Sequence, residues 1–317
     1  MSHSARHCVV VMYHYVRQAS STPFRGLKGL SVGRFRNQVD FLRNRYEMAT
    51  LESAMAFWRA DYFPSRDLCL LTFDDGIQDH YTNVLPILSE ARIQGLFFII
   101  TSCVADKKVM PVHKNQFLLA SCDFDEYRRA FLERLLDLEP DVDTIVDDDH
   151  ARSTYMWDSL EVARFKVLIN HKITAQQRDA VLDALFRDRL GNEVDFAEGL
   201  YLSWQQVRTM QKEGMLVGGH SHTHRPLARL RIEQAIEDLN DCSHILRLNT
   251  AAQTLWPFSY PYGKGDTFND HIIQSLKTMR FDCAFTTMPG VTGQGDDIFA
   301  LSRTDTNAIS GEKSAGV

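Results

Sequence analysis

Short runs of apolar residues recur along the chain and alternate with segments of helical periodicity. The first three runs are rich in β-branched or aromatic residues, as in strands buried on both faces, and they lie at 9–13, 69–73 and 96–100. The segments between them with helical spacing lie at 34–45, 51–59 and 80–94. Strands that alternate with helices in this way predict a parallel sheet.

The same alternation returns after residue 202. Ser203 and Gln206 have the spacing of a capping box at the start of a helix that runs to Glu213. We predict further strands at 215–217, 255–260, 282–287 and 298–302, and further helices at 232–248 and 268–279. The chain therefore reads as one α/β domain over residues 1–317.

Residues 105–200 depart from this rhythm. Leucine, valine and phenylalanine repeat there with helical spacing, and no strand-like run interrupts them. We interpret this stretch as a helical insertion in the domain. Its acidic segment, Asp141 to Asp149, is typical of a solvated connector.

Composition restricts the possible partners and the compartment. The formal net charge is −6, which argues against nucleic acid as a partner because that requires a basic surface. The six cysteines are scattered, without the spacing of a zinc ribbon or a disulfide framework. No stretch approaches the ~20 apolar residues of a membrane span, and the apolar run near the N-terminus is too short for a signal peptide. We therefore expect a cytoplasmic protein, and no pattern indicates its oligomeric state.

Two acidic residues follow the second apolar run. Asp74 and Asp75 are neighbours, so their side chains can act together only if the strand ends there and Gly76 allows a turn. Ligands of parallel α/β folds bind at the carboxyl ends of strands, where one carboxylate can hold a metal and the other can take a proton. An acidic pair also suits a simple strand-to-loop junction.

A histidine cluster follows another predicted strand. His220 and His224 are four residues apart, so on one helical turn or in a tight loop they face the same way, whereas His222 points elsewhere. Two imidazoles and one carboxylate of the acidic pair form a ligand set that leaves positions open for water and substrate, as in catalytic metal sites. Three histidines in five residues are also compatible with a polar loop.

Three segments together resemble a known family. Thr72 to Gly76 (TFDDG), His220 to His224 (HSxxH) and Tyr260 to Gly263 (YPYG) are similar, in the same order, to the first three motifs of the polysaccharide deacetylase superfamily, the NodB-homology domain of carbohydrate esterase family 4. The resemblance covers most of the chain outside 105–200. It implies a distorted (β/α) barrel of about seven parallel strands and hydrolysis of an acetyl group on a sugar, dependent on a metal.

The resemblance also implies roles for individual residues. Asp75, His220 and His224 would bind the metal, usually Zn²⁺, or another divalent transition metal. Asp74 would be the general base that takes a proton from the attacking water. Tyr262 would offer its backbone N–H to the oxyanion of the tetrahedral intermediate.

Two departures from the family pattern concern charge and proton transfer. The third motif of many members begins with an arginine that orients the base, but Ser259 occupies that place here. Arg303, which follows the last predicted strand, is our candidate to replace it, although a structural ion pair would explain it as well. The fourth motif, with its aspartate and tryptophan, has no clear counterpart.

The general acid is the second departure, because no histidine follows His271 near the C-terminus. Met12 to Val16 (MYHYV) resembles the N-terminal segment of the circularly permuted poly-N-acetylglucosamine deacetylases, whose acid histidine lies at the start of the chain. His14 is therefore our candidate for the acid, with a core histidine as the alternative. Asp305 is our candidate to hold the His14 imidazole in the required tautomer.

These features favour a metal-dependent deacetylase of an N-acetylated sugar in bacterial surface-polysaccharide biosynthesis. In the cytoplasm its substrate would be a nucleotide-linked or lipid-linked sugar, or a growing glycan, selected by the insertion. Two alternatives stay open: a hydrolase of a non-sugar amide C–N bond on the same fold, and an inactive glycan-binding module.

Overall fold

Seven parallel strands close into a barrel in the computed structural model, which describes residues 6–18, 23–24, 26–155 and 158–309. The barrel strands, in chain order, are β1 (Cys8–Tyr13), β3 (Leu68–Phe73), β4 (Gly95–Ile99), β5 (Leu216–Gly219), β6 (Pro257–Ser259), β7 (Cys283–Pro289) and β8 (Leu301–Asp305). Pairing of β1 with β3, from Cys8 opposite Leu68 to Tyr13 opposite Phe73, closes the ring. The short β2 (Glu47–Met48) pairs with β3 from outside. The predicted (β/α) barrel of about seven parallel strands is confirmed.

Alternate side chains of the strands face two different layers. Val9, Val11 and Tyr13 of β1 belong to the large core cluster that contains the surrounding helices. Cys8 and Val10 belong to a second cluster, together with Phe98 and Phe285 from other strands. Every residue of β1 and β3 is buried, which explains why their sequences are apolar apart from Thr72, whose hydroxyl donates to the carbonyl of Val11.

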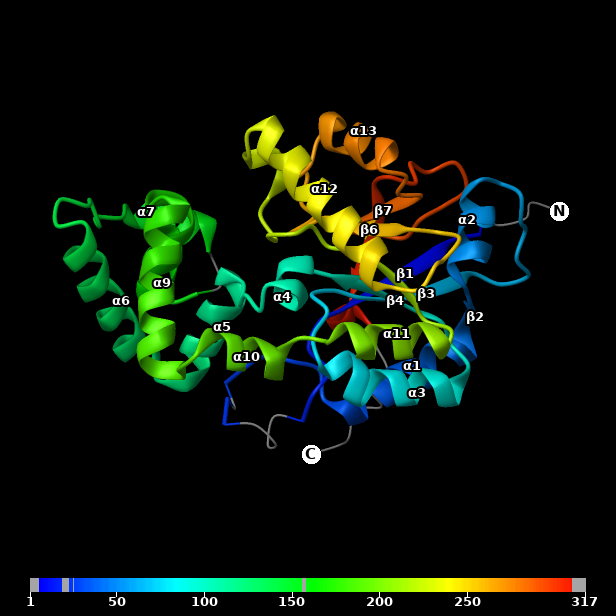
Figure 1. Ribbon diagram of the computed structural model, residues 1–317, viewed down its shortest axis with the longest axis horizontal. Coiled ribbons are helices and arrows are strands. Elements are labelled where there is room, and N and C mark those ends of the chain that lie inside the picture. Colours follow the sequence, from blue (N-terminus) through cyan, green and yellow to red (C-terminus); the bar gives the residue numbers. More distant parts are fainter. Residues whose placement is uncertain (1–5, 19–22, 25, 156–157, 310–317) are drawn as a thin grey trace. The chain divides into compact units, whose positions relative to one another are not determined.

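Helices surround the strands, with α12 and α13 on one side and α1, α3 and α11 on the other (Figure 1). The helices of this part are α1 (Val32–Arg45), α2 (Leu51–Trp58), the π-helical turn η2 (His80–Val84), α3 (Leu85–Ala91), α4 (Thr101–Ala105), α11 (Trp204–Lys212), η4 (Leu227–Arg229), α12 (Ile232–Asn249), α13 (Asp270–Thr278) and η5 (Thr306–Ala308). The predicted capping box is present at α11: Ser203 Oγ accepts from the Gln206 N–H at 3.2 Å, and the Ser203 N–H donates to Gln206 Oε1 at 2.8 Å. No helix in the described ranges is long and apolar enough to span a membrane.

The chain forms two compact units. The first contains the barrel and comprises Met1–Ser21, Lys28–Lys108 and Ala197–Val317; the second comprises Thr22–Leu27 and Val109–Phe196. Helices of the second unit are α5 (Pro111–Ser121), α6 (Phe124–Leu138), α7 (Asp148–Thr154), α8 (Leu160–Val167), η3 (Leu168–Lys172) and α9 (Ala175–Leu190), and α10 (Glu193–Leu200) follows them. Tyr127, Phe131, Phe165 and Leu182 lie in a core of its own.

The structure corrects several predicted element boundaries. The last strand, β8, lies at Leu301–Asp305 and not at 298–302, so Arg303 is inside the strand and does not follow it. In a sequence, a charged residue usually indicates that a buried strand has ended. Arg303 can lie inside this strand because its charge is paired with that of Asp74. The helix predicted at 80–94 is a π-helical turn followed by a shorter α-helix, and β6 is shorter than predicted.

Candidate metal centre and catalytic site

The acidic pair lies in a tight turn at the carboxyl end of β3. The Asp74 N–H donates to the carbonyl of Tyr13 at 2.9 Å, directly beyond the last residue pair of β1 and β3. Asp75 has a φ of 75° and Gly76 one of 64°, so the chain reverses through two left-handed residues. Both carboxylates are buried, with 1% of Asp74 and 5% of Asp75 exposed. The turn thus presents two adjacent acids with different surroundings.

The histidine cluster lies in the loop after β5, which is held by side chains as well as by backbone. The His220 N–H donates to the carbonyl of Ile99 at 2.9 Å, and the His224 N–H donates to Ser221 Oγ at 2.8 Å. Asp238 of α12 accepts from the N–H groups of His222 and Thr223 at 2.8 and 2.9 Å. These contacts fix the loop that carries both candidate metal ligands.

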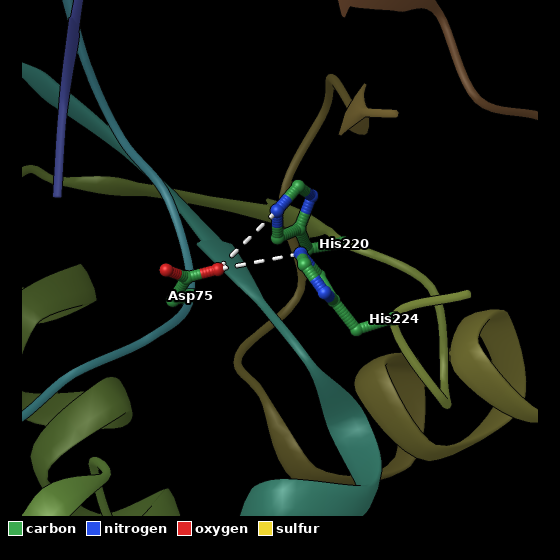
Figure 2. Close-up of side chains that lie close together, drawn as sticks. All are labelled: Asp75, His220 and His224. Atoms are coloured by element: carbon green, nitrogen blue, oxygen red, sulfur yellow. Dashed lines mark ion pairs between the residues drawn. The ribbon is translucent and has the colours of Figure 1, made fainter. Parts of the chain in front are cut away.

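Asp75, His220 and His224 converge from these two loops, as Figure 2 shows. Asp75 Oδ1 lies 3.5 Å from His220 Nε2 and 3.6 Å from His224 Nε2, and the three candidate ligand atoms lie within 4.8 Å of one another. Two atoms that bind one tetrahedral ion at about 2.0–2.1 Å are about 3.3–3.4 Å apart. The donor set and its spacing therefore fit a divalent metal.

The backbone of Ser259 sets the tautomer of His220. His220 Nδ1 lies 2.7 Å from the Ser259 carbonyl oxygen, which can only accept, so Nδ1 carries the hydrogen and Nε2 is left to face Asp75. Burial lowers the pKa of His220, but the neighbouring Asp74 and Asp75 outweigh it and raise that pKa. A metal at this site would compete with a proton for His220 Nε2.

Asp74 is bound by a buried arginine from β8. Arg303 Nη1 donates to Asp74 Oδ1 at 2.8 Å, and Arg303 Nη2 donates to Asp74 Oδ2 at 2.7 Å. Burial by itself raises the pKa of Asp74, but the Arg303 and His220 charges reverse this effect and hold the pKa at about 2. Asp74 is therefore ionised at neutral pH, as a general base must be.

Ser259 and Thr286 complete the surroundings of this ion pair. Arg303 Nη2 donates to Ser259 Oγ at 3.0 Å, and Ser259 Oγ lies 3.2 Å from Asp74 Oδ2. Arg303 Nε donates to the carbonyl of Thr286 at 2.7 Å. The guanidinium of Arg303 contacts Asp74 from β8. An arginine at the position of Ser259, as the family pattern has it, would contact the same carboxylate from β6. The structure thus brings Arg303 to Asp74 as part of a buried network.

Tyr262 and His14 lie beside the same strand ends. Tyr262 has a φ of 63°, and its ring centre is 5.1 Å from that of His224. His14 follows β1 as Asp74 follows the paired strand β3, its side chain is exposed, and its charge helps to lower the pKa of Asp74. Both residues therefore border the candidate site.

Asp305 and His222 are directed away from the centre. Asp305 Oδ1 accepts from the N–H and from Nδ2 of Asn307, and among the described residues it has no hydrogen bond with the His14 ring, which was its predicted partner. His222 Nδ1 lies 3.0 Å from Thr101 Oγ1, and His222 Nε2 lies 3.5 Å from Asp106. The expectation that the middle histidine points elsewhere agrees with this placement.

The roles of two residues of the site were not predicted from the sequence. Ser259 was noted there only as a missing arginine, but its hydroxyl joins the Asp74 network and its carbonyl orients His220. Asp238 supports the histidine loop from a buried position of α12, next to Leu239 and one turn after Ala235. An acid on the apolar face of a helix was the signal that could have found Asp238.

The family comparison matches more than half of the chain. The model described as polysaccharide deacetylase matches residues 63–153 and 166–284. The chain belongs to the polysaccharide deacetylase family. The matched residues include the acidic pair, both histidines and Tyr262, whereas His14 and Arg303 lie outside them.

Solved structures share the fold of this family member at low sequence identity. IcaB from Ammonifex degensii is 20% identical, with a TM-score of 0.59 over 96% of this chain and 94% of that one. Deacetylase PplD from Streptococcus pyogenes is 14% identical, with a TM-score of 0.58 over 95% and 93%. The BpsB deacetylase domain from Bordetella bronchiseptica is 14% identical, with a TM-score of 0.51 over 94% and 95%. No curated protein matches the chain.

Proposed function

We propose that this family member is a deacetylase that depends on a divalent metal, most simply Zn²⁺, and removes the acetyl group from an N-acetylated sugar. The observation that carries the proposal is the convergence of Asp75, His220 and His224 beside a second, separately paired carboxylate, Asp74. Ligands and base are thereby distinct groups, as hydrolysis assisted by a metal requires. The fold is shared with PplD, whose structure is described as a complex with acetate, the product expected here.

The residues of the chain divide the proton transfers between them. Bound metal would lower the pKa of the attacking water and polarise the acetyl carbonyl. Asp74, held ionised by Arg303, takes the proton of that water. The Tyr262 backbone N–H donates to the developing oxyanion, and His14 protonates the departing sugar amine.

The environment of Asp74 supports an enzyme over an inactive glycan-binding module. Ser259 in place of the family arginine and the missing C-terminal histidine suggested an inactive module. Arg303 supplies the charge from another strand, and His14 is the candidate that replaces the histidine. A binding module would have no need to keep a buried carboxylate ionised next to a metal-ligand set. We place the substrate, a nucleotide-linked or lipid-linked sugar or a growing glycan, in surface-polysaccharide biosynthesis in the cytoplasm.

Acetate release from metal-loaded protein tests the proposal. Purified protein is stripped with a chelator, reloaded with one equivalent of Zn²⁺, and incubated with N-acetylhexosamines in free, nucleotide-linked and oligomeric form. We expect acetate only from reloaded protein, and none from the Asp75→Asn variant. Release of ammonia from simple amides in place of acetate would favour the non-sugar hydrolase. Full activity of chelated protein would overturn the metal dependence.

A further inference from the structure

The segment after β1 makes further backbone contacts beyond the end of the barrel ladder. Its pairing with β3 ends at Tyr13, and Val16 then forms an isolated parallel bridge with Leu30. The Leu30 N–H donates to the carbonyl of Tyr15 at 3.0 Å, and the Arg17 N–H donates to the carbonyl of Leu30 at 2.9 Å. One edge of this short segment is thus paired with backbone.

The other edge is paired with side chains of the turn η2 and the residue before it. His80 Nε2 lies 3.0 Å from the carbonyl oxygen of His14, and Asn83 Nδ2 donates to the carbonyl of Val16 at 2.8 Å. Asp79 adds an ion pair with Arg17, whose Nε and Nη2 lie 2.6 and 2.9 Å from the two carboxylate oxygens. His80 and Asn83 thus supply donors to two backbone carbonyls of the segment, whereas Asp79 accepts from the side chain of Arg17.

The spacing of these side chains depends on an unusual turn. The Leu85 N–H donates to the carbonyl of His80, five residues earlier, which makes η2 a π-helical turn. Such turns are rare and occur frequently at functional sites. Because η2 follows the Asp74 and Asp75 turn by only a few residues, one short stretch of chain carries the acidic pair and also contacts the segment of His14.

His80 is a rigid donor. Its ring is completely buried, and its centre lies 5.5 Å from that of Phe73 and 5.6 Å from that of Phe97. A carbonyl oxygen can only accept, so His80 Nε2 carries the hydrogen of this contact. Burial also lowers the pKa of His80, to about 4, which keeps the ring neutral at neutral pH.

We propose that Asp79, His80 and Asn83 are positioning residues that hold the backbone of residues 14–17, and with it the imidazole of His14, in place for proton transfer. The inference rests on the proposed role of His14 as the general acid. The His14 side chain is itself exposed, so packing around the ring does not fix it. Its place relative to Asp74 is therefore determined by the contacts of its backbone, and a displacement of ~1 Å can cost ~10²-fold in rate.

Asn83→Asp is the decisive variant, because it replaces the donor to Val16 with an acceptor of nearly the same size. We expect kcat to fall about 10- to 100-fold with KM and metal content unchanged. Thr82→Ala is the matched control: Thr82 belongs to the same turn, but its hydroxyl donates to the carbonyl of Gln78 and does not contact residues 14–17. It should retain wild-type kcat.

A combination with His14→Ala separates positioning from general loss of structure. If Asn83 acts through His14, Asn83→Asp should lower kcat much less in the His14→Ala background than in the wild type. Equal losses in both backgrounds would overturn the inference. His80→Gln, which keeps an amide donor, should retain more activity than His80→Leu, and a reversed order would also contradict it.

Hydrogen exchange gives a readout that does not need a substrate. Amides of residues 15–17 should exchange faster in Asn83→Asp than in the wild type or Thr82→Ala, while those of β3 stay protected. Unchanged exchange in this segment overturns the positioning role even if activity falls. If residues 15–17 exchange faster in Asn83→Asp but the wild-type protein releases no acetate, the structural role of Asn83 is supported. The proposed function, on which its catalytic role rests, is then wrong.

Discussion

Arg303 pairs both of its terminal guanidinium nitrogens with both carboxylate oxygens of Asp74, at 2.8 and 2.7 Å. The two residues are 229 positions apart in the chain, and both are buried. This geometry fixes the carboxylate and keeps it ionised, which are the two properties that a general base next to a metal centre needs. A lysine offers a single point charge and cannot reproduce the paired contact.

Substitution of Arg303 should therefore impair both catalysis and stability. We expect Arg303→Lys to lower kcat/KM about 10²-fold, within the usual range for an acid or base that is no longer correctly held. Arg303→Gln should also lower the free energy of unfolding by about 3–5 kcal/mol, because Asp74 would remain buried without its partner. Acetate assays and urea unfolding measure the two effects. Wild-type values in both variants would contradict the role given to this pair.

Exchange of the residues at 259 and 303 tests whether the two positions are equivalent. Arg303→Ser alone should lose most of its activity, and Ser259→Arg alone should be destabilised because it adds a second cation to a buried site. The double variant should be about tenfold or more as active as Arg303→Ser, a difference of about 1.4 kcal/mol between these two variants. Ser259→Ala, which keeps the carbonyl that orients His220, is the control. Strictly additive losses would show that the positions are not interchangeable.

The two outer histidines of the loop should differ from the middle one in metal binding. His224→Ala should reduce the bound metal from about one ion per chain to a small fraction, because a three-ligand site loses a ligand. His222→Ala removes a ring directed toward Thr101 and Asp106 and should keep its metal. Elemental analysis after dialysis measures both. Equal metal loss in the two variants would point to general disruption of the loop.

Acid should destabilise the protein through His80 before it affects Asp74. Burial lowers the pKa of His80 from 6.5 to about 4, so between these values the unfolded chain binds a proton that the folded protein excludes. This contribution to stability is complete above about pH 6.5 and is lost as the pH falls toward 4, up to roughly 3 kcal/mol. The corresponding loss from Asp74 begins only below about pH 4.

Urea unfolding of wild type and His80→Gln between pH 4 and pH 7.5 measures this contribution. The variant has no titrating group at the position, so its free energy of unfolding should depend less on pH than that of the wild type. Parallel curves for the two proteins would exclude His80 as the source of the acid sensitivity.

Local patterns in the sequence determined the barrel and the candidate metal-ligand set. Apolar runs such as 69–73 are strands because only buried strands tolerate such composition in a parallel sheet, and acids or histidines mark where they end. Asp75 with His220 and His224 were found because motif spacing and strand ends are local properties. The two loops meet because parallel strands place their carboxyl ends on the same side of the barrel.

Tertiary structure alone decided how Asp74 is held and what supports His14. The partner of Asp74 comes from β8, which the sequence placed several residues too early because a buried arginine looks like the end of a strand. The contact of His80 with His14 requires a π-helical turn and the pairing of β1 with β3, neither of which has a short-range sequence signature. Local periodicity specifies where a strand ends, but closure of the barrel decides which side chains from distant strands meet there.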